Sequence, residues 1–239
     1  MTQYDQVVAA TSEEFDRYIG THSMLAHLTG GKLTRGEYIA YLRETYHMVR
    51  HTPRMLALAA ARCEDDRRGL RNWFIEQTEE ENNHDLFCIK DLRNFGESPD
   101  IVLAGQPLPG AWALVCQNYF MATYGNPAGI LGVASITEGL GASTAGSMAD
   151  LLVSHYGYGS ETVTFLRSHS GFDAKHLDET RRAINELVSS PEDLAAVIQG
   201  RRMTIYYYAQ MFSDCLANPY RTAADEEGDA DIILAVAAE

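Results

Sequence analysis

The sequence has few cysteines, and none of them is placed for a disulfide framework or a thiolate metal site. The 239 residues include four cysteines, Cys63, Cys88, Cys116 and Cys215. They form no CxxC pair and show no short spacing typical of a disulfide framework. This usage is typical of reduced thiols in a cytosolic protein. The GxSxG, P-loop and GxGxxG patterns are also missing, so serine hydrolase, kinase and dehydrogenase functions have no motif behind them.

Positive charge is scarce as well. Lysine and arginine number 19 against 33 acidic residues, which gives a formal net charge of −14 and argues against nucleic-acid or anionic-membrane partners. Residues 101–149 are almost free of charge but rich in Gly, Ser, Gln and Asn, too polar for a spanning helix. The N-terminal segment has no basic n-region and no apolar h-region. We therefore expect a soluble, cytoplasmic protein.

Apolar residues recur at three- and four-residue spacing through most of the chain, and strand-like alternation is nearly absent. Thr34 and Glu37 have the spacing of a capping box. We predict a single all-α domain over 1–239 with about seven to eight helices, its core at about 15–217, and an acidic tail loop with a short apolar end at 218–239. The predicted helices cover residues 4–28, 34–53, 66–95, 111–124, 127–156, 160–168, 172–188 and 191–217, with a loop at 97–109. Within the first of them, Thr11-Ser12-Glu13-Glu14 is the alternative for an internal start.

Glu138 is the only charged residue between Ile101 and Ala149. Its neighbours are mostly Gly, Ala and Ser, which let a helix pack closely on others and place it centrally. A buried carboxylate must be paired, protonated or metal-bound, because a lone charge in an apolar interior costs several kcal/mol, roughly. The alternatives are an exposed glutamate or one paired with an arginine.

His169, Asp173 and His176 stand at positions i, i+4 and i+7. On one helix they fall within an arc of roughly 60° and rise roughly 10 Å, which suits two metals flanked by histidines with Asp173 between them. The alternatives are a surface face with two histidines, or an interruption at Gly171 that leaves His169 in a turn.

Glu81 and His84 form an ExxH pair inside an acidic run that otherwise indicates a solvated helix face. Helical di-iron carboxylate proteins use such i, i+3 pairs together with carboxylates from other helices. Three histidines and three carboxylates without a thiolate suit iron or manganese better than structural zinc. The candidate ligands lie on three predicted helices: Glu81, His84, Glu138, His169, Asp173 and His176.

The block Leu28–Tyr38, with Tyr41-Leu42 and Tyr46–Pro53 after it, resembles the heme-oxygenase-like superfamily, which includes TenA-like and PQQ-synthesis-type proteins. Glu81/His84, Glu138 and the HxxxDxxH motif resemble its branch of iron-containing redox enzymes, the heme-oxygenase-like di-iron oxidases and oxygenases. The resemblance covers roughly residues 15–215.

The resemblance implies two Fe(II) ions, with manganese as an alternative, and O2 as cosubstrate. It also implies a small-molecule substrate, a homodimer, and Glu138 and Asp173 as catalytic residues. One departure concerns the first ligand helix, where Gln77 occupies the usual carboxylate position. Glu81 can take the same face, with Glu80 in reserve. Arg50, Arg167 and Lys175 are candidates for binding a substrate carboxylate, or are surface charges.

Three other functions compete with this hypothesis. A ferritin-like bundle would need a fourth ligand helix. A heme oxygenase would carry a proximal histidine upstream of the Thr34-Arg35 element, where this chain has Asp16. A metal-free TenA-like or tetrapyrrole-binding protein would keep Glu138 protonated, and Cys116 is the nearest equivalent of the TenA cysteine.

Overall fold

The computed structural model describes residues 1–220, apart from the side chains of Ile101 and Asp173. The described backbone is helical and contains no strand, which confirms the predicted all-α class. Most of the predicted acidic tail, residues 221–239, lies outside the described part.

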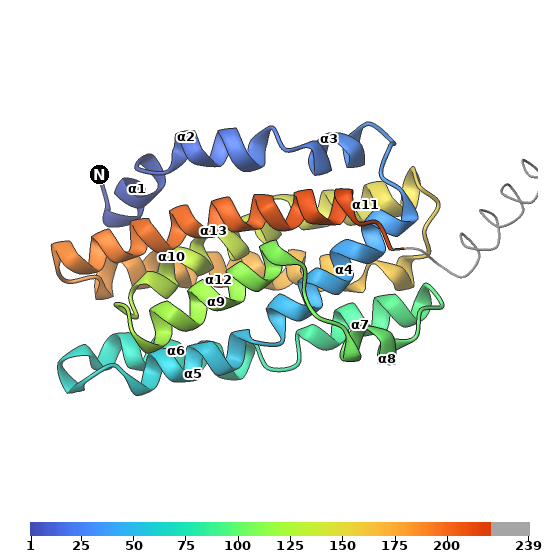
Figure 1. Cartoon of the computed structure of the whole chain (residues 1–239). Coiled ribbons are helices and arrows are strands. Elements are labelled where there is room, and N and C mark those ends of the chain that lie inside the picture. Colours follow the sequence, from blue (N-terminus) through green and yellow to red (C-terminus); the bar gives the residue numbers. More distant parts are fainter. Residues whose placement is uncertain (221–239) are drawn as a thin grey trace, which may run out of the picture.

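The helices lie side by side in an elongated bundle (Figure 1). The labels run to α13 because several predicted helices are divided, so the expected seven to eight helices were too few. In chain order they are α1 (Gln3–Ala9), α2 (Ser12–Phe15), α3 (Ser23–Thr29), α4 (Arg35–Val49), α5 (Thr52–Ala61), α6 (Arg68–Glu80), α7 (Asp85–Asn94), α8 (Pro99–Ala104), α9 (Pro109–Thr123), α10 (Gly129–Leu140), α11 (Gly146–Ser154), α12 (Thr164–Leu187) and α13 (Pro191–Ala217).

The region 4–28 is not one helix, and the alternative of an internal start at Thr11–Glu14 is confirmed, because α2 begins at Ser12 with Thr11 as its N-cap. The chain breaks at Thr11, whose buried hydroxyl donates to the Val7 carbonyl at 3.0 Å and accepts from Arg201 Nε at 2.9 Å. A π-helical turn (Asp16–Gly20) follows, and the His22 ring then caps α3 by accepting the Met24 N–H at 3.0 Å. Hydrogen bonds from side chains to the backbone thus divide this segment into short helices, although its apolar spacing is that of one continuous helix.

The predicted capping box is confirmed at the start of α4. Thr34 Oγ1 accepts the Glu37 N–H at 3.2 Å, and Glu37 Oε2 accepts the Thr34 N–H at 2.7 Å. Pro53 lies in the first turn of α5, where a missing N–H costs nothing. The proline therefore starts a helix that the sequence analysis omitted, and a short helix, α8, similarly occupies part of the predicted loop 97–109.

The C-terminal half is more continuous than predicted. The segments 160–168 and 172–188 form one helix, α12, which runs straight through Gly171. A single interior glycine costs only about 1 kcal/mol, so it does not break a helix that is packed along one side. Between α10 and α11 the chain stays helical through a π-helical segment (Gly141–Ala145).

The long helix α13 runs along the bundle, with α1 to α3 on one side and α5 and α6 on the other (Figure 1). The closest packing is between α10 and α13, where a Cβ added at Gly200 would collide with the Gly129 carbonyl and one at Gly132 with the Val197 carbonyl. The predicted role of small residues is therefore confirmed at Gly129 and Gly132, which let α10 lie deep in the bundle.

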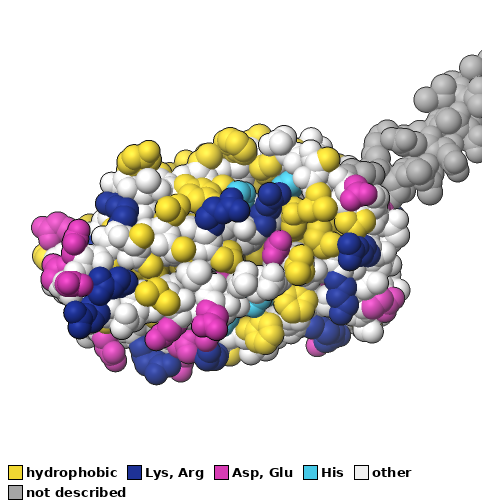
Figure 2. Space-filling view, turned by 90° about the horizontal axis from the view of Figure 1, so that it is seen from below, with side chains coloured by type: hydrophobic (Ala, Val, Ile, Leu, Met, Phe, Trp, Pro, Cys, Tyr) yellow, Lys and Arg dark blue, Asp and Glu magenta, His cyan; other side chains and the backbone are white. Residues whose placement is uncertain are grey.

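On the face shown in Figure 2, acidic and basic side chains are scattered, with hydrophobic side chains between them. No helix among residues 1–220 combines the length and the apolar character needed to cross a bilayer.

Candidate metal centre

Glu81 and His84 do not lie on a continuous helix, contrary to the prediction for 66–95. Helix α6 ends at Glu80 and α7 begins at Asp85. Between them Asn83 has a φ of 70°, a left-handed conformation that asparagine tolerates better than most residues. Glu81 and His84 therefore reach the interior from a turn.

Three of the predicted residues meet in a tight cluster. One possible metal-ligand atom from each of Glu81, Glu138 and His176, a carboxylate oxygen or an imidazole nitrogen, lies within 4.8 Å of the other two. Nδ1 of His176 is 3.5 Å from Glu81 Oε1 and 3.4 Å from Glu138 Oε2. These side chains come from the α6–α7 turn, α10 and α12, so three separate segments converge here; we call them the carboxylate–histidine trio.

Two more imidazoles lie beside the trio. Nδ1 of His84 is 3.2 Å from Glu81 Oε2, and the His84 and His169 rings are 5.1 Å apart between centroids. Nδ1 of His169 lies 2.8 Å from the Phe165 carbonyl oxygen. Because a carbonyl only accepts, that nitrogen carries the proton and Nε2 keeps a free lone pair. The side chain of Asp173 lies outside the described part of the chain.

Glu80 lies at the other edge of the His176 ring. Its Oε2 is 2.9 Å from His176 Nε2, and its Oε1 is 2.7 Å from Lys175 Nζ. Nδ1 of His176 faces the two trio carboxylates while Nε2 faces Glu80, so Glu80 lies on the other side of the ring and is not itself in the trio. Gln77 donates to Glu179 Oε2 at 3.3 Å.

His176 is buried, Glu81 and Glu138 are largely shielded from solvent, and no described lysine or arginine neutralises the two carboxylates. The side chains of Glu81, Glu138 and His176 are 11%, 15% and 5% exposed. Among the described residues, no lysine or arginine forms an ion pair with Glu81 or Glu138, and Thr137 Oγ1 donates to Glu138 Oε1 at 3.2 Å. The alternatives of an exposed Glu138 and of an arginine-paired Glu138 are therefore wrong.

Burial and charge act on these groups in opposite directions. Burial raises the pKa of Glu138; His176 opposes the rise and the Glu81 charge adds to it. Burial also tends to raise the pKa of Glu81, but His84, His176 and His169 outweigh it, so the pKa falls. Burial lowers the pKa of His169 to about 4, which keeps this imidazole neutral at pH 7, the form that binds metals.

The residues present fit an iron ion. Nδ1 of His84 and Nδ1 of His176 are both buried without a hydrogen-bond partner, although carboxylate oxygens lie 3.2 to 3.5 Å away. Buried polar atoms seldom lack a partner, and a cation between nitrogen and carboxylate would satisfy both. Two carboxylates with imidazoles form a donor set that suits iron or manganese.

A cavity of about 130 Å³ adjoins the trio. Glu81, Glu138 and His169 form part of its wall, and most of the rest is aliphatic and aromatic, including Phe165 and Leu166 of α12. These wall residues could not be identified from the sequence, because an apolar side chain that lines a cavity has the same spacing as one that fills a core.

The three basic residues considered for substrate binding do not line this cavity. Arg167 pairs with Asp150 at 3.0 Å and is 44% exposed. Lys175 pairs with Glu80, and the Arg50 guanidinium lies 5.4 Å from the centroid of the Tyr46 ring. They are surface and packing charges.

Residues 39–209 match the family described as iron-containing redox enzymes. The chain belongs to this family. The matched range contains every residue of the trio, and the match confirms the resemblance stated from the sequence. Among curated proteins, none matches.

Solved structures confirm the heme-oxygenase-like fold of this family member. A domain of unknown function with a heme oxygenase-like fold from Shewanella denitrificans is 22% identical, with a TM-score of 0.82, covering 90% of this chain and 92% of that one. A TenA homolog from Pseudomonas syringae is 16% identical, with a TM-score of 0.74 and coverage of 90% and 93%. A TenA homologue from Pyrococcus furiosus is 14% identical, with a TM-score of 0.71 and coverage of 89% and 99%.

Proposed function

We propose that this chain is a non-heme iron enzyme that uses O2 to oxidise or oxygenate a small organic molecule, with two iron ions held between the α6–α7 turn, α10 and α12. The observation that carries the proposal is the trio of Glu81, Glu138 and His176 in the interior, which pairs with no described lysine or arginine and whose two glutamates line a largely apolar cavity. Membership in the family of iron-containing redox enzymes supports the choice of metal.

Each ligand has a distinct part in this proposal. His84, His169 and His176 would supply nitrogens, and Glu81 and Glu138 would supply oxygens and balance the positive charge. Asp173 is proposed as a further ligand and, with Glu138, as a catalytic residue. When bound, iron supplies the capacity to bind and reduce O2. The apolar cavity holds the substrate beside Glu138 and keeps bulk water away.

Anaerobic titration with Fe(II), followed by desalting and measurement of iron per chain, tests the proposal. We expect two ions per chain in the wild type and a loss of at least one in Glu138→Ala and in His176→Ala. Glu76→Ala, which removes an exposed carboxylate of α6, serves as the matched control and keeps both ions. When the iron-loaded protein is then exposed to O2, it should consume O2 in proportion to the bound iron. No iron uptake above background would refute the proposal.

A metal-free TenA-like or tetrapyrrole-binding function is the alternative, and the fold likeness to TenA homologues favours it. Cys116, the nearest equivalent of the TenA cysteine, is exposed on α9 and is not part of the cavity wall. Visible spectra recorded after adding hemin and, separately, Fe(II) distinguish the two. A Soret shift with hemin and no iron uptake would favour the alternative.

A further inference from the structure

The charge on the cavity wall limits what the cavity can hold. Among the described wall residues, the only acidic ones are Glu81 and Glu138, and none is lysine or arginine. An anionic group away from the trio would lose its hydration and gain no cation in return, at a cost of several kcal/mol, roughly. The wall away from the trio therefore disfavours an anionic group.

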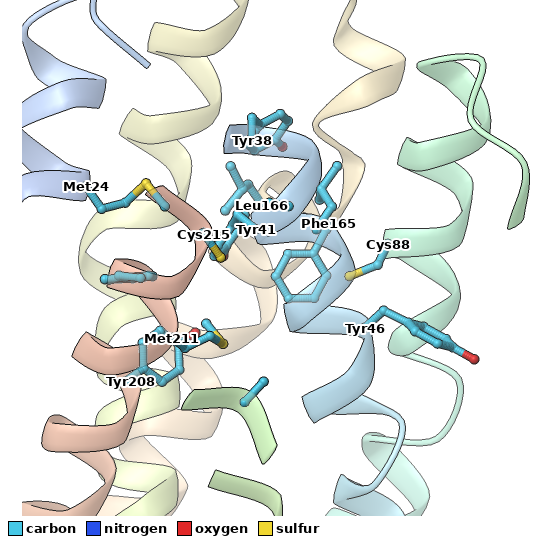
Figure 3. Close-up of a cluster of buried hydrophobic side chains, with 14 of the residues drawn as sticks. Met24, Tyr38, Tyr41, Tyr46, Cys88, Phe165, Leu166, Tyr208, Met211 and Cys215 are labelled. Carbon is cyan, nitrogen blue, oxygen red and sulfur yellow. The ribbon is translucent and has the colours of Figure 1, made fainter. Parts of the chain in front are cut away.

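The wall is also apolar over most of its extent. Figure 3 shows Tyr41 of α4, Phe165 and Leu166 of α12, and Tyr208 of α13 gathered between their helices. All four are cavity-wall residues and all are buried within the molecule. Apolar surface of this kind binds hydrocarbon, since each methylene transferred from water gains about fourfold in affinity.

A second, smaller hollow of about 20 Å³ lies beyond the first. Its wall, which includes Leu28, Leu33 and Leu152, exposes only apolar atoms. The two hollows have three wall residues in common: Tyr41, Met148 and Phe212. These three side chains therefore lie between the two hollows, and we call them the partition; the smaller hollow is lined by residues of α3, α4, α11 and α13.

We propose that the substrate is a linear, largely aliphatic molecule that is uncharged along its length, and that the partition of Tyr41, Met148 and Phe212 sets the longest chain accepted. Met148 is the movable member, because methionine is unbranched and changes rotamer easily. The assignment of the reacting end to Glu81 and Glu138 rests on the proposed function, whereas the chain-length limit rests on the two hollows alone.

Calorimetric titration of the metal-free protein with the neutral n-alkanols from hexanol to dodecanol tests the proposal. In the wild type we expect affinity to rise about fourfold per added methylene and then to stop rising at the length that reaches the partition. Met148→Ala joins the hollows and should extend the rise by about two or more carbons, and Leu152→Phe in that background should reverse the extension.

Met203→Ala is the matched control, because Met203 is half-buried on α13 and is not part of either wall. It should keep the wild-type length limit. Affinity that does not depend on chain length in the wild type would overturn the proposal, and so would a limit that is unchanged in folded Met148→Ala protein. Because no metal is added, a negative result here leaves the iron titration unaffected, and failure to bind iron leaves the alkanol profile unaffected.

Discussion

Glu80 and Glu81 are adjacent in the chain, yet they face different edges of the His176 ring. Spacing from His84 was enough to favour Glu81 over Glu80, because ExxH is a known ligand spacing on helices. The position of Glu80 could not be predicted, since it depends on the end of α6 and on the place of His176 on another helix. The sequence alone gives the residue types of the trio, and the arrangement of their atoms comes from packing.

We predict that Glu80→Ala weakens Fe(II) binding by about 10- to 100-fold, the usual effect of removing a carboxylate that orients a metal-binding histidine. Nε2 of His176, 2.9 Å from Glu80, would lose the group that orients the ring. Competition with a chelator of known affinity measures the change.

Glu80→Gln, which keeps an acceptor oxygen, should restore part of the iron affinity, and Glu76→Ala should have none of the effect. Equal affinity in wild type and Glu80→Ala would show that Glu80 does not position His176.

Glu44 gives a prediction about pH, away from the metal centre. It is buried on α4 and accepts the Leu108 N–H at 2.7 Å. Burial raises its pKa from 4.5 to about 7, with Leu108 and Arg43 opposing and Asp214 adding to the rise. Between pH 4.5 and about pH 7, Glu44 is therefore ionised in the unfolded chain and still largely protonated in the folded chain. The contribution of Glu44 to stability is therefore full below pH 4.5 and is lost as pH rises through 7.

Glu44→Gln removes this titration and keeps an oxygen for the Leu108 N–H. Relative to wild type, its free energy of unfolding should increase between pH 5 and pH 8, by an amount on the order of 3 kcal/mol at most. Urea denaturation at several pH values measures the difference. A variant whose stability runs parallel to wild type over this range would contradict the raised pKa.

At the scale of the elements, sequence patterns located helices better than they located breaks. The capping box at Thr34 and the start of α13 were predicted, because capping and turn residues act over three or four positions. The break at Asn83 was not: asparagine favours turns and tolerates the left-handed conformation, but the ExxH spacing of Glu81 and His84 indicated a continuous helix. Gly171 caused the opposite error, since a glycine suggested a break where packing keeps α12 whole.

Gly171 and Gly200 make a matched pair of helix glycines. A Cβ at Gly171 meets nothing within 4 Å, so Gly171→Ala should raise the free energy of unfolding by about 0.5–1 kcal/mol through reduced backbone entropy of the unfolded chain. A Cβ at Gly200 would collide with the Gly129 carbonyl. Gly200→Ala should therefore lower the free energy of unfolding by about 1–3 kcal/mol.

Thermal or chemical denaturation of the two variants checks whether the free energy of unfolding rises in Gly171→Ala and falls in Gly200→Ala. Destabilisation by Gly171→Ala would indicate that α12 is not continuous at this point, and a neutral Gly200→Ala would contradict the close approach of α10 and α13.

At the scale of the whole molecule, the all-α class and the family follow from the sequence, because helical periodicity and spaced ligands are local features that add up along the chain. The cavity, the partition and the cluster of wall residues do not, because each is made by side chains from several helices. Burial of Glu138 falls between these cases: its isolation among small, uncharged residues indicated burial, and the structure supplied His176 as its neighbour.

We propose above that Glu81, Glu138 and His176 hold iron in the interior of this bundle. The most direct test is anomalous diffraction at the iron absorption edge from crystals grown anaerobically with Fe(II). We predict a peak between the carboxylates of Glu81 and Glu138 and the imidazole of His176, within bonding distance of all three. Iron peaks only at the molecular surface, or no peak in crystals that contain Fe(II), would contradict the account.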